Sequence, residues 1–94
     1  MPKYKIKRVE LGSVIEVDLF AYPEEKELVK EKARILMCKL RNLKLIGKDE
    51  LNVVKGEAYG LYSYNFKVQC LSARKENQIR KEIEGLGFEE EEEV

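Results

Sequence analysis

The sequence of residues 61–71 is LYSYNFKVQCL, in which apolar and polar residues alternate. The apolar set is Tyr62, Tyr64, Phe66, Val68 and Cys70, and the polar set is Ser63, Asn65, Lys67 and Gln69. A period of two residues predicts a half-buried β-strand. The aromatic side chains could serve as a base-stacking platform. Their face continues into Val68 and Cys70, however, and this favours packing beneath another layer of the fold.

Three more segments have strand patterns, and turn residues join the four segments into two hairpins. The first hairpin links residues 4–11 to residues 14–22 through Gly12-Ser13, a two-residue connection that suits a type II′ turn. The second hairpin links residues 52–59 about Gly60 to the strand quoted above. Both connections predict antiparallel pairing.

Two segments are predicted to be helices. Pro23 suits the first turn of one helix, and Gly47 suits its left-handed stop. Its apolar stripe for packing on a sheet is Leu28, Val29, Ala33, Leu36, Met37, Leu40 and Leu43. Ser72 is a predicted N-cap of the second helix. Its apolar residues are Ile79, Ile83 and Leu86, with Gly85 and Gly87 as stops.

The expected fold class is α+β, a two-layer sandwich in which two helices cover one face of an antiparallel sheet, in the order ββαββα. A ferredoxin-like βαββαβ variant requires residues 88–94 to pair as a strand and residues 4–11 to be an added edge strand. The run Glu89–Glu93 opposes this variant, because like charges repel along a strand. We therefore expect one domain over residues 1–88 and an acidic tail over residues 89–94.

Composition removes several kinds of chemistry. The 94 residues include no His, so no imidazole base is present to activate a Ser or Cys nucleophile. Cys38 and Cys70 are isolated, whereas structural zinc needs clustered ligands. Glu16 and Asp18 could form a metal-holding pair, but a solvated sheet face explains them better. We expect a protein that is not an enzyme, with no catalytic, cofactor-binding or metal-binding residues.

The source and the compartment are inferred from residue usage. Glu is far more common than Asp, and Lys is more common than Arg, as in proteins of thermophiles. The first residues, MPKYKIKRVELG, alternate charged and apolar residues and contain neither a signal peptide nor a membrane span. We therefore expect a cytoplasmic protein with no membrane partner and with two reduced thiols that act as small hydrophobic side chains.

The first functional hypothesis is a protein-interaction module that forms a homo-oligomer, most simply a homodimer. Ile35, Cys38 and Leu45 lie off the apolar stripe of the first helix, on a side rich in charged residues. An exposed apolar patch often marks a protein contact. These three residues are the predicted oligomer contact, unless a neighbouring loop covers them.

The alternative is a nucleic-acid-binding protein. One sector of the first helix and the first strand supply the candidate polyanion contacts, which are Lys26, Lys30, Arg34, Arg41 and Lys44 on the helix and Lys3, Lys5, Lys7 and Arg8 on the strand. Setting Glu89–Glu93 aside leaves 13 acidic residues against 18 basic ones, so the neutral total hides a basic body that the tail could mask. Glu27 and Glu31 lie three residues before Lys30 and Arg34, which also fits ordinary surface pairs.

Overall fold

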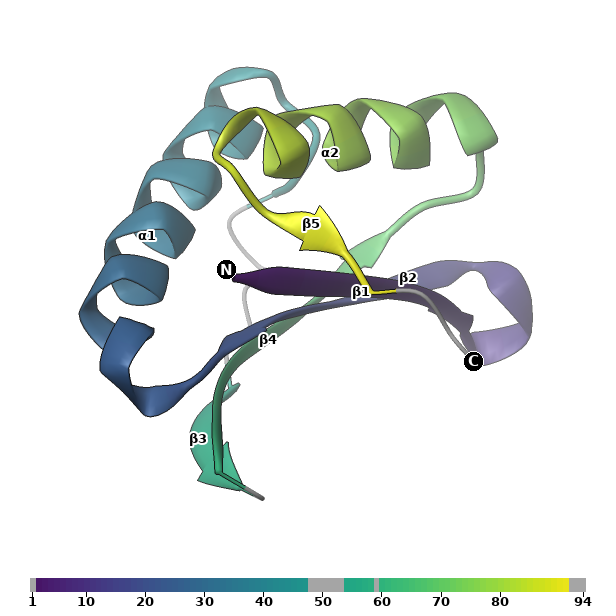
Figure 1. Ribbon diagram of the computed structural model, residues 1–94. Coiled ribbons are helices and arrows are strands. Elements are labelled where there is room, and N and C mark those ends of the chain that lie inside the picture. Colours follow the sequence, from purple (N-terminus) through teal and green to yellow (C-terminus); the bar gives the residue numbers. More distant parts are fainter. Residues whose placement is uncertain (1, 48–53, 59, 92–94) are drawn as a thin grey trace.

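The protein forms an α+β sandwich, seen in a computed structural model that describes residues 2–47, 54–58 and 60–91 (Figure 1). Its elements in chain order are β1 (Lys3–Val9), the 3₁₀ turn η1 (Glu10–Gly12), β2 (Val14–Ala21), the 3₁₀ turn η2 (Pro23–Glu25), α1 (Lys26–Asn42), β3 (Val54–Ala58), β4 (Leu61–Gln69), α2 (Ala73–Gly85) and β5 (Glu89–Glu90). The predicted strand positions 52, 53 and 59 lie outside the described residues. The predicted fold class is confirmed.

The sheet has the strand order β3-β4-β2-β1-β5. Four strands pair antiparallel as predicted, but β5 runs parallel to β1, so the sheet is mixed. β1 therefore lies between two strands and is not the edge strand of the ferredoxin-like variant. Burial of Phe88 brings the chain back to β1, where Glu89 N donates to Pro2 O at 3.1 Å and Glu91 N donates to Tyr4 O at 2.9 Å.

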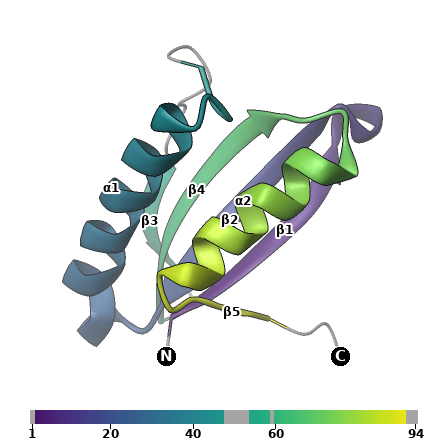
Figure 2. The same ribbon diagram turned by 90° about the horizontal axis from the view of Figure 1, so that it is seen from above.

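Both helices lie on one side of the sheet, and in the view from above α2 runs along β1 and β2 while α1 lies toward β3 and β4 (Figure 2). The alternation read from the sequence decides which strand residues they cover. The buried residues of β2 and β4 are Ile15, Val17, Leu19, Ala21, Tyr62, Tyr64, Phe66 and Val68. The predicted packing of the aromatic residues is confirmed, and the polar residues of these strands lie on the open face.

The turn between β1 and β2 differs from the predicted two-residue connection. The last paired residues are Val9 and Val14, which leaves a four-residue loop. Within it Glu10 and Leu11 have positive φ angles of 51° and 58°, and Ser13 Oγ donates to Glu10 O at 2.7 Å. Leu11 in this loop is fully exposed, so its side chain does not contribute to the core.

The end of α1 also differs from the prediction. The left-handed residue is Lys44, with φ 58°, and not Gly47. Leu45 N donates to Leu40 O and Lys44 N donates to Arg41 O, both at 2.9 Å, which is the Schellman arrangement. The turn buries Leu45 in the core cluster that also holds Leu40, and this burial favours the turn although its left-handed residue is not a glycine.

Two residues assigned to the apolar stripe of α1 are exposed. Leu28 and Leu43 keep 45% and 48% of their surface accessible, so the stripe is narrower than predicted. The buried stripe is Val29, Ala33, Leu36, Met37 and Leu40. In α2, by contrast, the predicted cap is confirmed, because Ser72 Oγ accepts a hydrogen bond from Lys75 N at 3.1 Å.

The predicted acidic tail begins inside the fold. Glu89 and Glu90 form β5, and Glu89 Oε2 lies 3.0 Å from Lys3 Nζ. Glu90 forms an ion pair with Arg80 of α2. Like-charge repulsion in this short strand is offset by a basic partner for each carboxylate. Residues 92–94 lie outside the described residues.

We predict that Phe66→Ala lowers the free energy of unfolding by about 3–5 kcal/mol, because the ring is fully buried between the sheet and the helices. Urea denaturation at neutral pH measures the change. Leu71→Ala is the control, since Leu71 is 81% exposed and its truncation should stay within about 0.5 kcal/mol of the wild type. Equal effects of the two substitutions would contradict this core assignment.

Candidate functional site

The nine predicted polyanion contacts do not form one surface. Lys3, Lys5 and Lys7 project from β1 on the open face of the sheet, since they alternate with the buried Tyr4. Lys30, Arg34 and Arg41 line a groove beside α1. The remaining three lie elsewhere, with Lys44 exposed after the end of α1 and with Arg8 and Lys26 engaged in contacts within the chain.

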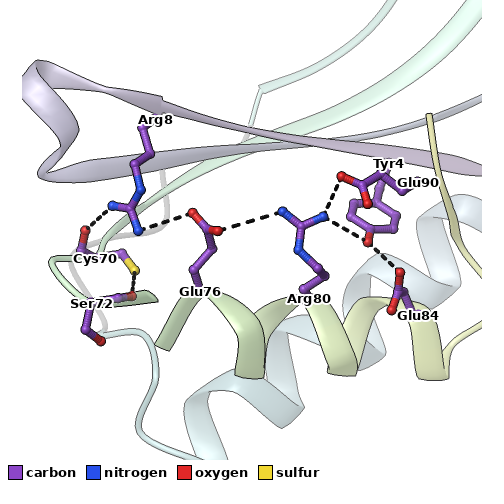
Figure 3. A network of polar contacts seen from close by, with 8 residues as sticks. All are labelled: Tyr4, Arg8, Cys70, Ser72, Glu76, Arg80, Glu84 and Glu90. Carbon is purple, nitrogen blue, oxygen red and sulfur yellow. Dashed lines mark hydrogen bonds and ion pairs between the residues drawn. The ribbon is translucent and has the colours of Figure 1, made fainter. Parts of the chain in front are cut away.

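Arg8 ties the sheet to α2 (Figure 3). Its Nη1 donates to Gly12 O at 2.9 Å and to Cys70 O at 3.0 Å, and its Nη2 lies 3.2 Å from Glu76 Oε1. The guanidinium of Arg8 thereby links the turn at Gly12, the chain at Cys70 and helix α2. Arg8 therefore has a structural role in this fold, and its role as a polyanion contact stays a prediction.

A polar network continues from Glu76 along α2 to Tyr4, as Figure 3 shows. Tyr4 Oη donates to Glu84 Oε2 at 2.7 Å and accepts from Arg80 Nη1 at 3.3 Å. Arg80 also pairs with Glu90 of β5. Burial is the main cause that raises the pKa of Tyr4 from 10.0 to about 12, and the hydrogen bond to Glu84 adds to the rise. The phenol therefore stays protonated as a donor, and the network joins α2 and β5 to β1.

The groove lies between α1 and the β3–β4 side of the sheet and has a volume of about 480 Å³. The residues that line it are Glu27, Lys30, Glu31, Arg34, Met37, Cys38, Arg41, Lys55 and Tyr64. Met37 and Tyr64 are buried and form its apolar floor. The charged residues lie at its rim, where four cations outnumber two carboxylates.

The cations of the groove differ in how strongly the chain already engages them. Arg34 holds Glu31 through two hydrogen bonds of 2.6 and 3.2 Å. Lys55 Nζ lies 5.6 Å from the ring centre of Tyr64, a cation–π geometry. Among the described residues, Lys30 and Arg41 form no ion pair. Burial raises the pKa of Tyr64, and the positive charge of Arg41 opposes that rise.

Sequence reasoning missed Lys55, which comes from β3 and not from α1. The signal was the hairpin register, because Lys55 pairs with Tyr64 and therefore lies on the helix-covered side of the sheet. Lys26 occupies a related position opposite Tyr62, 5.7 Å from the ring centre, but it is paired with Glu57 at 3.3 Å. The groove thus joins a predicted helix stripe to one unpredicted lysine.

The predicted oligomer contact is not a continuous patch. Cys38 is exposed and Ile35 is partly buried, but Leu45 is only 8% exposed and belongs to the core. Leu45 was wrongly assigned to the surface because the Schellman turn redirects the chain after Leu43. Cys38 and Cys70 are both free thiols, as expected, and Cys70 is buried.

The open face of the sheet carries a hollow of about 770 Å³ lined by Lys5, Ile6, Lys7, Glu16, Asp18, Glu90 and Glu91. Burial, together with the charge of Glu16, raises the pKa of Asp18. Glu16 accepts a hydrogen bond from Asn65 Nδ2 at 3.0 Å and lies 3.9 Å from Lys7 Nζ. In the described part of the chain, no three His, Cys, Asp or Glu side chains are grouped to hold a metal ion.

Comparisons with known proteins give no assignment. Scans of protein-family models, curated proteins and solved structures each found no match to this chain. Over the described residues, no helix is both long enough and apolar enough to cross a membrane.

We predict that Tyr4→Phe lowers the free energy of unfolding by about 1.5–3 kcal/mol below pH 10, because a hydrogen bond to a charged partner is lost. The pKa of Tyr4 is raised by folding, so its stabilising effect disappears as the pH rises from 10.0 to about 12. The gap between the two proteins should close over that window. Urea unfolding at a series of pH values measures it, with Tyr22→Phe at an exposed position as the control. A gap independent of pH would contradict the assignment.

Proposed function

We propose that this protein is a non-enzymatic module that binds single-stranded nucleic acid along the groove between α1 and the β3–β4 hairpin. The observation that carries the proposal is the convergence of Lys30, Arg34 and Arg41 from α1 with Lys55 from β3 around one groove. Cations from two elements can contact successive phosphates of one strand. This arrangement favours the nucleic-acid hypothesis over the interaction patch, which loses Leu45 to the core.

The free cations supply the phosphate contacts. Lys30 and Arg41 have no carboxylate partner in the described residues, so phosphates need not displace an existing ion pair there. In the part of the chain that the structure describes, Lys55 lies over the face of Tyr64 and forms no ion pair, so its ammonium keeps its donors for a ligand. Neutralising phosphates with such residues releases counterions, which makes binding strongly dependent on salt.

The dimensions of the groove favour a single strand. Its volume of about 480 Å³ falls in the range of pockets that hold small molecules, and this suits one or two nucleotides and not a duplex. Met37 and the ring of Tyr64 form an apolar floor on which a base or a sugar can rest. Tyr64 is 8% exposed, so it offers a contact surface and not a free stacking platform.

Two carboxylates limit the number of phosphates that the groove can hold. Glu31 is neutralised by Arg34, whereas Glu27 stands at the rim near Lys30. Their presence favours a short binding site over a continuous basic track. The acidic strand β5 lies at the opposite edge of the sheet from β3, so Glu89 and Glu90 do not mask this groove.

Charge reversal in the groove tests the proposal. We predict that Arg41→Glu and Lys55→Glu each weaken binding of a fluorescent single-stranded oligonucleotide by at least roughly tenfold at low salt. Each variant should also reduce the slope of log K against log salt by about 0.7, the value for one phosphate contact on a single strand. Fluorescence anisotropy across a salt series measures both quantities.

The matched control is Lys81→Glu, which makes the same charge change on an exposed residue of α2. Equal weakening by the control would show non-specific attraction and overturn the groove as the site. Absence of binding by the wild type at low salt would overturn the function itself.

Cys38 offers a second readout of where the ligand lies. It lines the groove and is exposed, whereas Cys70 is buried, so a thiol reagent should modify Cys38 first. We predict that a saturating oligonucleotide slows the alkylation of Cys38. Unchanged alkylation in the bound state would place the ligand elsewhere.

A further inference from the structure

The open face of the sheet carries its charges in rows that follow the strands. The row on β1 consists of Lys3, Lys5 and Lys7, and the neighbouring row on β2 contains Glu16 and Asp18. The strand register places Lys5 beside Asp18 and Lys7 beside Glu16. A positive row and a negative row therefore run side by side on a face that neither helix covers (Figure 1).

The carboxylates of this face are incompletely satisfied within the chain. Oδ1 of Asp18 is buried and has no hydrogen-bond partner among the described residues. Lys7 approaches Glu16 only to 3.9 Å, and 68% of its side chain stays exposed. A buried polar atom without a partner costs free energy.

We propose that a second copy of this chain packs on the open face, sheet against sheet, so that the β1 lysine row of each copy lies over the β2 carboxylate row of the other. The occupant follows from charge complementarity, since the face carries both signs in adjacent rows and is complementary to itself. A polyanion fits this face less well, because Glu16 and Asp18 would repel its phosphates.

The charge pattern selects one two-fold axis. An axis parallel to the strands and midway between β1 and β2 exchanges the two rows and keeps each residue at its own level along the strand. Lys5 then lies over the partner's Asp18, and Lys7 lies over the partner's Glu16. The other two-fold axis that is parallel to the sheets runs perpendicular to the strands. It would place the lysine row of one copy over the lysine row of the partner, and repulsion between like charges disfavours it.

The outer rows fit the same axis. It places β5 of one copy over β4 of the other, because these strands lie one position outside β1 and β2. At matching levels, Glu89 faces the partner's Ser63 and Glu91 faces the partner's Asn65, whose hydroxyl and amide groups can donate to carboxylates. The groove beside α1 lies on the other side of the sheet and stays open in this dimer.

The contact area is small, so the dimer should be weak. β1 and β2 each overlap the partner over about seven residues, and the two-residue β5 overlaps β4 of the other copy on either side. With strands about 4.8 Å apart and about 3.3 Å per residue, the contact covers roughly 300 Å² per copy, which lies in the range of weak, transient interfaces. Ion pairs across such an interface are screened by salt. We therefore expect dimerisation at high protein concentration and low salt, and dissociation as salt rises.

Two single charge reversals test the arrangement. Lys5→Glu and Asp18→Lys each place like charges at both copies of the Lys5–Asp18 contact, so each variant alone should weaken the dimer at least roughly tenfold. In a mixed pair of the two variants, both contacts again join opposite charges. Sedimentation equilibrium of each variant and of their mixture measures association, and a tag on one variant identifies the mixed dimer.

We expect the mixture to form a mixed dimer whose Kd lies within about threefold of the wild-type value. Because restored association requires both variants to be folded, unfolding cannot produce this result. Ile35→Glu, which alters the contact predicted from the sequence, should leave the dimer intact and is the control. A wild type that stays monomeric at high concentration and low salt, or a mixture that associates no better than the single variants, would overturn the proposal.

Discussion

The apolar faces of β2 and β4 lie beneath both helices, and this packing determines where every other group is placed. Ile15, Val17 and Phe66 are fully buried at the centre of that layer. Because strand residues alternate, their burial sends Glu16, Asp18 and Asn65 to the opposite face. The alternation of strand residues therefore creates a buried apolar layer between the sheet and the helices and an exposed, charged face on the other side of the sheet.

The same packing produces the groove. Both helices lie on one face of the sheet, and the flank of α1 that carries Lys30, Arg34 and Arg41 is brought beside β3 and β4. The chain is neutral as a whole, but its charges are segregated. The groove has an excess of cations, whereas the open face has alternating rows. Such segregation lets one small domain offer two surfaces of different chemistry.

Local patterns predicted the parts of the fold that depend on local contacts. Alternation in residues 61–70 identified the buried aromatic residues, and Ser72 was recognised as a cap. The pairing of β5 with β1 was not predicted. It depends on the burial of Phe88 and on ion pairs with Lys3 and Arg80, and these contacts join residues that are far apart in the sequence. The basic residues that α1 contributes to the groove were predicted, because they follow from helical spacing within one segment. Lys55 was not predicted, because strand pairing brings it to the groove from a distant part of the sequence.

We propose that a strand of nucleic acid binds in the groove beside α1 and leaves the open sheet face free. Backbone amide shifts recorded by NMR during titration with a short single-stranded oligonucleotide test where the strand binds. The largest changes should fall on α1, on β3 and on β4 near Arg41, Lys55 and Tyr64, with little change at Lys5 and Asp18. The largest changes at Lys5 and Asp18, with none along α1, would place the nucleic acid on the open sheet face and rule out the groove.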